Sequence, residues 1–494
     1  MIKFGTGGWR AVIGDAFTKA NIQLLAKAVA DMMHEEGVAD DGIVIGYDRR
    51  FLSKEAMQWL ACTFAAEGIR AELINKSAPT PLVMFYVAHH HLHYGMMVTA
   101  SHNPALYNGV KVFTEGGKDA DEEKTAEIEA HIRRILDQRE DRRDAEVPVK
   151  ELPYDEALQA GLIREIYPLN EYLDSIIDTV DMEAIKRRGL RIALDPMYGV
   201  SETSLKTILM TARCEVETIH ERHDTLFGGK LPAPTQETLK SLQEYVLDRH
   251  CDMGIATDGD ADRIGVIDDQ GNFLHPNDIL VLLYYYLHRF KGWTGPAVRN
   301  ICTTHLLDRV AKAFGEECYE VPVGFKHISA KMYATNAVIG GESSGGMAVR
   351  GHIRGKDGIY ASALLVEMIS VTGMKLSELM EQIRNEFGGM QLVERDYRFS
   401  DARKEEIKKI LLEDKKLPEI NVPVQKVSYL DGLKIYFADL ITENGQESTG
   451  TDGCGGWISV RFSGTEPLLR IFCEMKTREE AERLCKTFEN FLDL

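Results

Sequence analysis

The chain has few cysteines, no long apolar run and no excess of basic residues, and each absence excludes a class of protein. The eight cysteines among 494 residues form no C-x-x-C pair, so we expect reduced core residues rather than a disulfide framework. The longest apolar stretch, Ile279–Leu287, is too short to span a bilayer. The segment Met1–Arg10 contains no apolar region typical of a secretion signal. These features predict a cytoplasmic protein that does not enter a membrane.

The charge balance predicts a protein that does not bind nucleic acid. Lysine and arginine number 58 against 77 acidic residues, for a net charge of −19, which repels phosphate backbones and anionic membrane surfaces. Any anionic ligand must therefore be held by local arginine and lysine side chains. The hydrophobic share of 44% is that of an ordinary folded protein, and the length favours about two to four domains.

A βαβ pattern occurs three times along the chain. In the first copy an apolar strand, Ile43–Gly46, leads through a polar turn to a helix that ends near Ala66 and then to a strand, Ala71–Ile74. The second copy begins with a strand at Arg191–Leu194, and the third with a strand at Pro296–Ile301. Three consecutive similar α/β domains are the expected result.

Each copy is followed by a short apolar strand that ends in a loop of small and polar residues. The three loops lie at 95–104, 254–263 and 337–346. Ligands bind in loops at the carboxyl ends of strands in open α/β sheets, so we expect the three domains to face one central cleft. The pattern after Phe387 changes to a fourth, smaller α+β domain, whose closing helix begins with the capping box Thr477–Glu480. The charged stretch Asp119–Lys150 is expected to be a solvated helix and linker.

The second loop offers a cation site. Asp258, Asp260 and Asp262 alternate along one stretch, so an extended loop turns all three carboxylates toward one cation, and oxygen ligands suit Mg²⁺. An EF-hand is excluded because its sixth position is Arg263 rather than glycine. A solvated acidic turn is the remaining alternative. The histidine-rich tract at 89–93 is a weaker metal candidate, for which a solvated helix end is the simpler interpretation.

The first loop exposes a hydroxyl. Ser101 lies among small residues before Pro104, and a hydroxyl there can accept and return a phosphoryl group, although serine and asparagine before proline also form ordinary turns. His102 and Lys111 are candidates for holding or protonating phosphate oxygens.

The remaining loops are candidates for binding a sugar phosphate. Glu342, Ser343 and Ser344 lie among four glycines, in a flexible backbone that can approach a polyol; a serine-hydrolase elbow is excluded because no histidine lies far enough downstream. The segment Arg461–Arg470 resembles a phosphate clamp, with two arginines around Ser463, Gly464 and Thr465. The opening Phe4–Arg10 is a possible second phosphate loop but not a nucleotide P-loop.

Taken together and in this order, these motifs resemble the α-D-phosphohexomutase family. They read T-A-S-H-N-P, D-G-D-A-D-R, G-E-x-S-G and R-F-S-G-T-E-P, and the opening F-G-T-G-G-W-R is similar to the family's F-G-T-S-G-x-R. The resemblance covers the whole chain. Gly7 stands where the family usually has serine, so this position offers no side-chain hydroxyl, although Arg10 remains.

The resemblance implies four domains: 1–160 with the phosphoserine, 161–275 with the metal, 276–388 for the sugar and 389–494 for the distal phosphate. It implies that phosphorylated Ser101 coordinates one Mg²⁺ with the three aspartates, and that Arg10, Lys111 and Arg263 surround the reacting phosphoryl group. Glu342 and Ser344 would bind sugar hydroxyls, and the non-reacting phosphate would be held by the clamp residues, which are Arg461, Ser463, Gly464, Thr465 and Arg470. Lys326 is favoured over His327 as the general base.

The implied activity is that of a phosphoglucomutase, an intramolecular phosphotransferase that interconverts glucose 1-phosphate and glucose 6-phosphate through a hexose 1,6-bisphosphate. The alternatives are a phosphomannomutase or bifunctional hexose mutase and, further off, a phosphoglucosamine or phosphopentose mutase. A sugar-phosphate binding protein without turnover and a phosphatase are rivals from other classes. The expected partners are small hexose phosphates, and the expected state is a monomer or homodimer.

Overall fold

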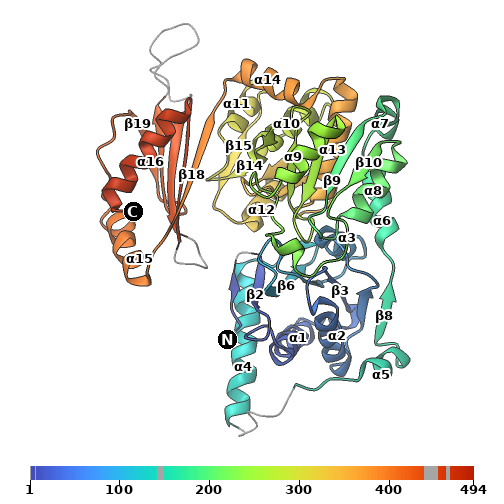
Figure 1. Ribbon diagram of the computed structural model, residues 1–494. Coiled ribbons are helices and arrows are strands. Elements are labelled where there is room, and N and C mark those ends of the chain that lie inside the picture. Colours follow the sequence, from blue (N-terminus) through green and yellow to red (C-terminus); the bar gives the residue numbers. More distant parts are fainter. Residues whose placement is uncertain (1, 6, 142–148, 439–453, 463–467) are drawn as a thin grey trace. The chain divides into compact units, whose positions relative to one another are not determined.

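The computed structural model describes residues 2–5, 7–141, 149–438, 454–462 and 468–494 (Figure 1). They form two compact units, one of residues 1–279 and 344–378 and the other of residues 280–343 and 379–494. The first two sheets along the chain lie in the first unit, and the C-terminal sheet lies in the second. The chain has an α/β fold, with three successive α/β domains and a smaller α+β domain at the C-terminal end, as predicted.

The first unit begins with an eight-stranded mixed sheet in the order β1-β2-β6-β5-β3-β4-β8, with β7 paired to β6. The neighbouring strands β5, β3, β4 and β8 are parallel, whereas β6 is antiparallel to β5. The bounds are β1 (Phe4–Gly5), β2 (Gly8–Val12), β3 (Ile43–Tyr47), β4 (Ala71–Ile74), β5 (Tyr94–Val98), β6 (Tyr107–Thr114), β7 (Lys118–Asp119) and β8 (Ile163–Ile166).

Helices cover both faces of this sheet because successive strand residues point to opposite sides. Ile43 and Ile45 of β3 pack in one core with α1 (Lys19–Glu35), α2 (Ser53–Ala66) and α4 (Glu122–Asp141), and Figure 1 shows α1 and α2 side by side. On the other face α3 (Thr80–His89) lies so close that a Cβ on Gly46 would stand 2.5 Å from Val83 Cγ2. The polar loops after β3 and β5 therefore meet at one sheet edge.

The prediction of a solvated helix and linker at Asp119–Lys150 is confirmed for the helix, which is α4, although one stripe of α4 is buried. Asp119 belongs to β7, and the helix α4 buries Ile128 and Ile132 in the first domain's core against α1. These two isoleucines form an apolar stripe at four-residue spacing on a helix that is otherwise rich in charged residues. Residues 142–148 lie outside the described residues.

The second sheet of this unit has the order β10-β9-β11-β12-β13. Its strands are β9 (Arg191–Asp195), β10 (Glu215–Thr218), β11 (Met253–Thr257), β12 (Ile264–Ile267) and β13 (Phe273–Leu274). The helices near this sheet are α6 (Leu169–Ile177), α7 (Met182–Arg188), α8 (Glu202–Thr211), α9 (Lys240–Arg249) and α13 (Gly358–Thr372). The helix α5 (Tyr154–Gln159) packs on the first sheet through Ala157, and the short strand β17 (Met347–Val349) belongs to the four-stranded sheet of β14, β15 and β16. The antiparallel hairpin of β11 and β12 brackets the aspartate loop.

In the second unit, β14 (Ala297–Asn300) lies between β15 (Cys318–Val321) and β16 (Ile339–Gly341), and all three are parallel. A Cβ on Gly340 would meet Ile328 of α12, and a Cβ on Gly341 would meet Leu280 of α10, so these helices cover opposite faces. The helix bounds are α10 (Pro276–Arg289), α11 (Leu306–Ala313), α12 (Phe325–Thr335) and α14 (Leu376–Phe387).

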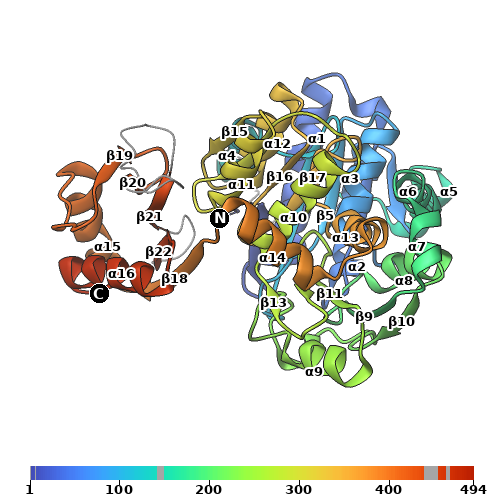
Figure 2. The same ribbon diagram turned by 90° about the horizontal axis from the view of Figure 1, so that it is seen from above.

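The C-terminal domain is an antiparallel sheet in the order β18-β22-β21-β20-β19. Figure 2 shows α15 and α16 along one side of it. The N-cap of the predicted capping box is confirmed, because Thr477 Oγ1 accepts the N–H of Glu480 at 3.3 Å. The bounds are β18 (Gln391–Arg398), α15 (Asp401–Lys408), β19 (Val424–Ser428), β20 (Leu433–Ala438), β21 (Cys454–Phe462), β22 (Leu468–Met475) and α16 (Arg478–Leu492).

Two absences concern the described residues only. Within them, no single helix is long and apolar enough to cross a membrane. The bent pair Gly358–Thr372 and Leu376–Phe387 reaches that length and apolar composition only when its two helices are taken together. The seven cysteines whose side chains are described are all free, and six of them are buried.

Candidate active site

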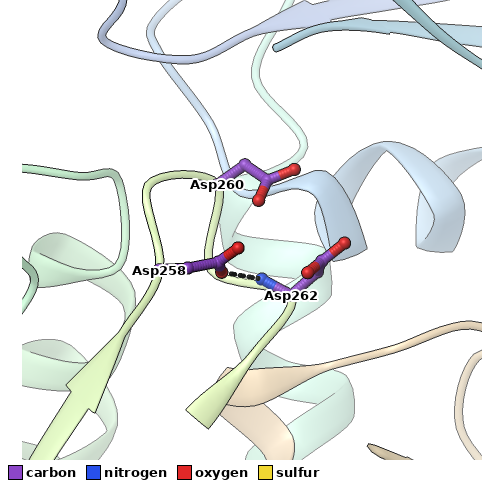
Figure 3. Close-up of side chains that lie close together, drawn as sticks. All are labelled: Asp258, Asp260 and Asp262. Carbon is purple, nitrogen blue, oxygen red and sulfur yellow. Dashed lines mark hydrogen bonds between the residues drawn. The ribbon is translucent and has the colours of Figure 1, made fainter. Parts of the chain in front are cut away.

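The three aspartates of the second loop converge as predicted. Asp258, Asp260 and Asp262 are buried, each offers a carboxylate oxygen, and these oxygens lie within 4.8 Å of one another. Figure 3 shows the three carboxylates facing a common space, with Asp258 Oδ1 accepting the N–H of Asp262 at 3.1 Å. Among the described residues this is the one acidic or histidine group with the geometry of a metal site.

The donor set fits a hard divalent cation. The Oδ1 atoms of Asp260 and Asp262 are buried and make no hydrogen bond to any described residue. Burying an acceptor without a hydrogen bond costs free energy, so these two oxygens are available for a ligand. Burial and the two neighbouring carboxylates raise the pKa of Asp258 well above its usual value. Oxygen-only ligands of this kind are those that Mg²⁺ prefers.

Lysines hold the other two carboxylates in the ionised form. Lys111 Nζ lies 2.7 Å from Asp260 Oδ2 and 2.6 Å from Asp262 Oδ2. Burial alone would raise the pKa of Asp262, but Lys111, Lys356 and Arg263 together hold it below its usual range. The same attraction raises the pKa of Lys111 despite its burial, so the cluster carries charges of both signs at neutral pH.

Ser101 reaches this cluster directly. Its Oγ donates to Asp258 Oδ2 at 2.6 Å, and its backbone adopts the left-handed conformation with φ of 51°. The side chain is fully buried. His102 lies beside it, with Nδ1 3.4 Å from Ser101 Oγ; the charge of Arg263, burial and Arg10 lower the pKa of His102 well below its usual value, so the ring is neutral near pH 7.

Two arginines predicted for this region also lie near the aspartates. Arg263 Nε is 4.0 Å from Asp258 Oδ2 and 3.9 Å from Asp262 Oδ1, and it makes no hydrogen bond within the described part of the chain. Burial and the neighbouring Arg263 lower the pKa of Arg10. A Cβ on Gly7 would stand 3.7 Å from Arg10 Nη2, so the opening loop lies against this arginine.

Arg50, which the sequence analysis did not select, holds the Ser101 loop in place. It donates to the carbonyl oxygens of Ser101 and Asn103, both at 2.6 Å, and of Pro104 and Tyr107. Asp48 accepts hydrogen bonds from the Arg50 backbone at 2.9 Å and from Thr99 Oγ1 at 2.7 Å. The sequence feature that could have identified Arg50 is the polar turn after Ile43–Gly46. Parallel neighbouring strands end at the same sheet edge, so this turn lies beside the Ser101 loop.

Lys356 is a second residue that the sequence analysis missed. Its Nζ lies 3.0 Å from Asp262 Oδ2. The next residue, Asp357, caps α13 by accepting the N–H groups of Ile359 and Tyr360 at 2.9 Å. A Cβ on Gly358 would stand 2.6 Å from the carbonyl oxygen of Arg263, so only glycine permits this approach. A K-D-G sequence before an apolar helix was the available signal.

The predicted sugar and base residues lie at loop and helix ends. Glu342 follows β16 and is half-buried, whereas Ser344 is exposed. Lys326 is the second residue of α12, after Gly324, which has a φ of 129°.

The predicted phosphate clamp is described only in part. Arg461 and Arg470 are directly paired across the β21–β22 hairpin. Arg461 Nη2 lies 3.2 Å from Asp431 Oδ2, and Arg470 Nε lies 3.5 Å from Asp396 Oδ1. The predicted clamp residues Ser463, Gly464 and Thr465 lie outside the described residues.

Four domain families match successive segments of the chain. They are the phosphoglucomutase/phosphomannomutase alpha/beta/alpha domains I, II and III at residues 1–139, 170–271 and 275–387, and the C-terminal domain at 419–490. A Thermococcus kodakarensis protein named phosphoglucomutase/phosphomannomutase is 30% identical over 97% of this chain and 95% of its own length. The chain belongs to the α-D-phosphohexomutase family.

Other relatives carry different substrate names. A Methanopyrus kandleri protein named as a probable phosphoglucosamine mutase is 29% identical over 98% of this chain and 96% of its own length. The crystal structure of a candidate phosphomannomutase from Thermus thermophilus superposes with a TM-score of 0.81 at 29% identity, covering 100% of this chain and 99% of that one. This phosphohexomutase is therefore an isomerase-type phosphotransferase, as predicted.

Proposed function

We propose that this phosphohexomutase is a magnesium-dependent phosphoglucomutase that works through phosphorylated Ser101. The observation that supports it most directly is the 2.6 Å hydrogen bond from Ser101 Oγ to Asp258 Oδ2 inside a buried triad of carboxylates. A hydroxyl in that position lies next to a divalent cation once the triad holds one. The cation would neutralise phosphoryl oxygens and stabilise charge in the transfer.

The reaction needs two phosphoryl transfers in opposite directions. In the first, the bond between phosphorus and Ser101 Oγ breaks and a bond to the free sugar hydroxyl oxygen forms, while the hydroxyl proton goes to a base, for which Lys326 is the candidate. The hexose 1,6-bisphosphate then reorients in the site, so that its other phosphoryl group faces Ser101. In the second transfer the bond between the other phosphorus and its sugar oxygen breaks, that phosphoryl group returns to Ser101 Oγ, and the sugar oxygen takes back a proton, which leaves the isomeric monophosphate. A trace of free bisphosphate would act as activator by phosphorylating Ser101 of enzyme that lacks the phosphoryl group.

Cationic side chains around Ser101 are suited to the reacting phosphoryl group. Lys111, Arg263 and Arg10 place three positive charges near the aspartates, and phosphoryl transfer relies mainly on such positioning and charge stabilisation. Both Arg10 and Arg263 have a buried Nε that makes no hydrogen bond to a described residue. These donors can pair with phosphoryl oxygens.

The other end of the substrate is assigned to residues of the third and fourth domains. Glu342 and Ser344, two positions apart in the chain, would bind sugar hydroxyls. Arg461 and Arg470 would hold the non-reacting phosphate together with Ser463, Gly464 and Thr465. An arginine pair on neighbouring strands is suited to bidentate contacts with a phosphate dianion.

The choice of sugar is the finer part of the proposal. Glucose is preferred over mannose, with a bifunctional enzyme as the alternative, and glucosamine and pentose phosphates are less favoured. The names of the relatives include mannose and glucosamine substrates. Glu342 and Ser344 would contact hydroxyls that several of these sugars share, so the substrate has to be ranked by experiment.

The test is conversion of glucose 1-phosphate to glucose 6-phosphate with Mg²⁺ and a trace of glucose 1,6-bisphosphate. Mannose, glucosamine and ribose 1-phosphates are assayed in parallel, and inorganic phosphate release is followed in the same samples. Turnover on glucose 1-phosphate that stops with EDTA is the expected result. A higher kcat/KM for another sugar would replace glucose as substrate, phosphate release faster than isomerisation would indicate a phosphatase, and no turnover on any sugar would favour a binding protein.

A further inference from the structure

Asp431 lies in the loop between β19 and β20 and joins two segments that are distant in sequence. Its two carboxylate oxygens accept hydrogen bonds from Arg461 Nη2 at 3.2 Å and 3.4 Å. The Oδ2 atom also accepts the backbone N–H of Val323 at 2.9 Å. One carboxylate thus fixes a clamp arginine relative to the segment that leads into α12, where Lys326 lies.

The loop is shaped for close approach to Arg461. Gly432, which follows Asp431, has a φ of 83°, a conformation that favours glycine. A Cβ there would stand 2.7 Å from the carbonyl oxygen of Val460 and 2.9 Å from Arg461 Cβ. The Asp-Gly sequence therefore does more than turn a hairpin, because the glycine lets the aspartate reach the arginine beside it.

The support behind this loop is firmly anchored. Lys434, two residues after Gly432, is buried and donates from Nζ to the carbonyl oxygen of Ile301 and to Glu320 Oε2, both at 2.6 Å. Its Nζ also lies 3.0 Å from His305 Nε2. These contacts fix the start of β20 against β14 and β15, so the position of Asp431 is set from two sides.

The Arg461 guanidinium keeps donors for a ligand. Its side chain is 16% exposed, and its Nε is buried without a hydrogen-bond partner among the described residues. Arginine carries five N–H donors in a rigid planar fork. Holding Nη2 at Asp431 fixes the plane of that fork and leaves the remaining donors in a defined direction.

We propose that Asp431 is a positioning residue for the substrate's non-reacting phosphate, which acts by fixing the orientation of the Arg461 guanidinium. The proposal rests on the phosphate-clamp role assigned to Arg461 in the proposed function. Asp431 does not itself contact the substrate, since two carboxylate oxygens and a phosphate repel each other. Asp431 restricts the Arg461 side chain before the phosphate binds, so binding costs less side-chain entropy.

The test compares Asp431→Asn, Asp431→Ala and Arg461→Ala in the full-length enzyme, with Glu482→Gln as control. Glu482 forms an exposed ion pair with Arg478 on α16 at 2.9 Å. The control variant therefore also removes a carboxylate that is paired with an arginine in the same domain. We expect KM for glucose 1-phosphate to rise about tenfold in Asp431→Ala and less in the isosteric Asp431→Asn, with kcat changed less than about threefold. Glu482→Gln should leave both constants unchanged.

A double-mutant cycle separates positioning from a general structural role. In the Arg461→Ala background, Asp431→Ala should raise KM no further, because the arginine it orients is gone. An unchanged KM, a fully additive effect, or a loss of kcat alone would overturn the proposal. A lower KM would do so as well, because it would mean that Asp431 competes with the phosphate for Arg461.

The outcome can be told apart from failure of the proposed function. If the wild-type enzyme turns over and Arg461→Ala raises KM while the Asp431 variants behave like wild type, only the positioning role fails. If Arg461→Ala itself leaves KM unchanged, the clamp assignment fails with it. Thermal melting of each unliganded variant checks that Asp431→Asn keeps the fold.

Discussion

Ser101 Oγ donates a 2.6 Å hydrogen bond to Asp258 Oδ2, although 157 residues separate them in sequence. The contact joins the loop after β5 of the first sheet to the loop between β11 and β12 of the second. Ser101 O also lies 2.8 Å from the place where a Cβ on Gly259 would stand. The two loops therefore fit each other closely, and their separate chemistries become one site.

Ser101→Ala is expected to abolish mutase turnover without loss of folding. The phosphoryl group then has no acceptor oxygen, so kcat should fall by at least about 10⁴-fold. Steady-state kinetics and mass spectrometry of the intact protein, before and after incubation with glucose 1,6-bisphosphate, measure this. The matched control is Ser362→Ala, which removes a buried hydroxyl bonded to Gly358 O; a variant of Ser101 that still isomerises would disprove the phosphoserine assignment.

Mg²⁺ is expected to raise the melting temperature of the enzyme through the aspartate triad. A ligand that binds only the folded state stabilises it, by about 2.7 kcal/mol when the free ligand is about 100-fold above Kd. Asp260→Asn removes one of the three carboxylates and should reduce the Mg²⁺-induced shift. Asp248→Asn, on the exposed surface of α9, should show the wild-type shift, and an equal shift in all three proteins would place the cation elsewhere.

Arg50→Lys is expected to impair both stability and turnover. Arg50 donates to four carbonyl oxygens of the Ser101 loop, and a lysine ammonium cannot reproduce that planar fork. We expect a loss of about 2–4 kcal/mol of unfolding free energy and a fall in kcat/KM of about 10–100-fold. Arg49→Lys, which changes a neighbour bonded to the single carbonyl of Glu221, is the control. Chemical denaturation and steady-state kinetics with glucose 1-phosphate measure the two effects, and equal effects of the two variants would contradict the prediction.

We expect the unfolding free energy of the second unit to depend on pH through Lys434. Burial and the nearby Arg299 lower its pKa to about 8 in the folded protein, partly offset by Glu320, whereas an unfolded lysine titrates near about 10.4. Between these values the unfolded chain binds more protons, so the unfolding free energy rises with pH across this window, and this gain is absent below about pH 8.

The measurement is the melting temperature of wild type and Lys434→Met from about pH 7.5 to about pH 9.5. The difference should move in favour of wild type as the pH rises. Lys426→Met, an exposed lysine on β19, should follow wild type throughout. A difference that stays constant with pH would show that Lys434 titrates at its usual value.

Local sequence patterns predicted much of the fold. The structure contains the predicted strands at Ile43–Gly46, at Arg191–Leu194 and within Pro296–Ile301, and it contains the N-cap at Thr477. Such features depend on residues within a few positions of one another, which is the range that periodicity and capping report. Within Asp119–Lys150 the helix was predicted, but its buried stripe at Ile128 and Ile132 was not, because many charges outweigh a narrow apolar stripe in composition.

The sequence by itself determined the family, the three α/β repeats and the grouping of Asp258, Asp260 and Asp262, because alternate residues in one short loop share a face. Only the tertiary structure placed Arg50 on the Ser101 loop, Lys356 on Asp262 and Asp431 on Arg461. Each of these pairs joins separate segments, and nothing in the spacing of either segment specifies its partner. Their meeting is decided by strand order, which brings loop ends together at one sheet edge, and by glycines such as Gly358 and Gly432, which let two backbones approach.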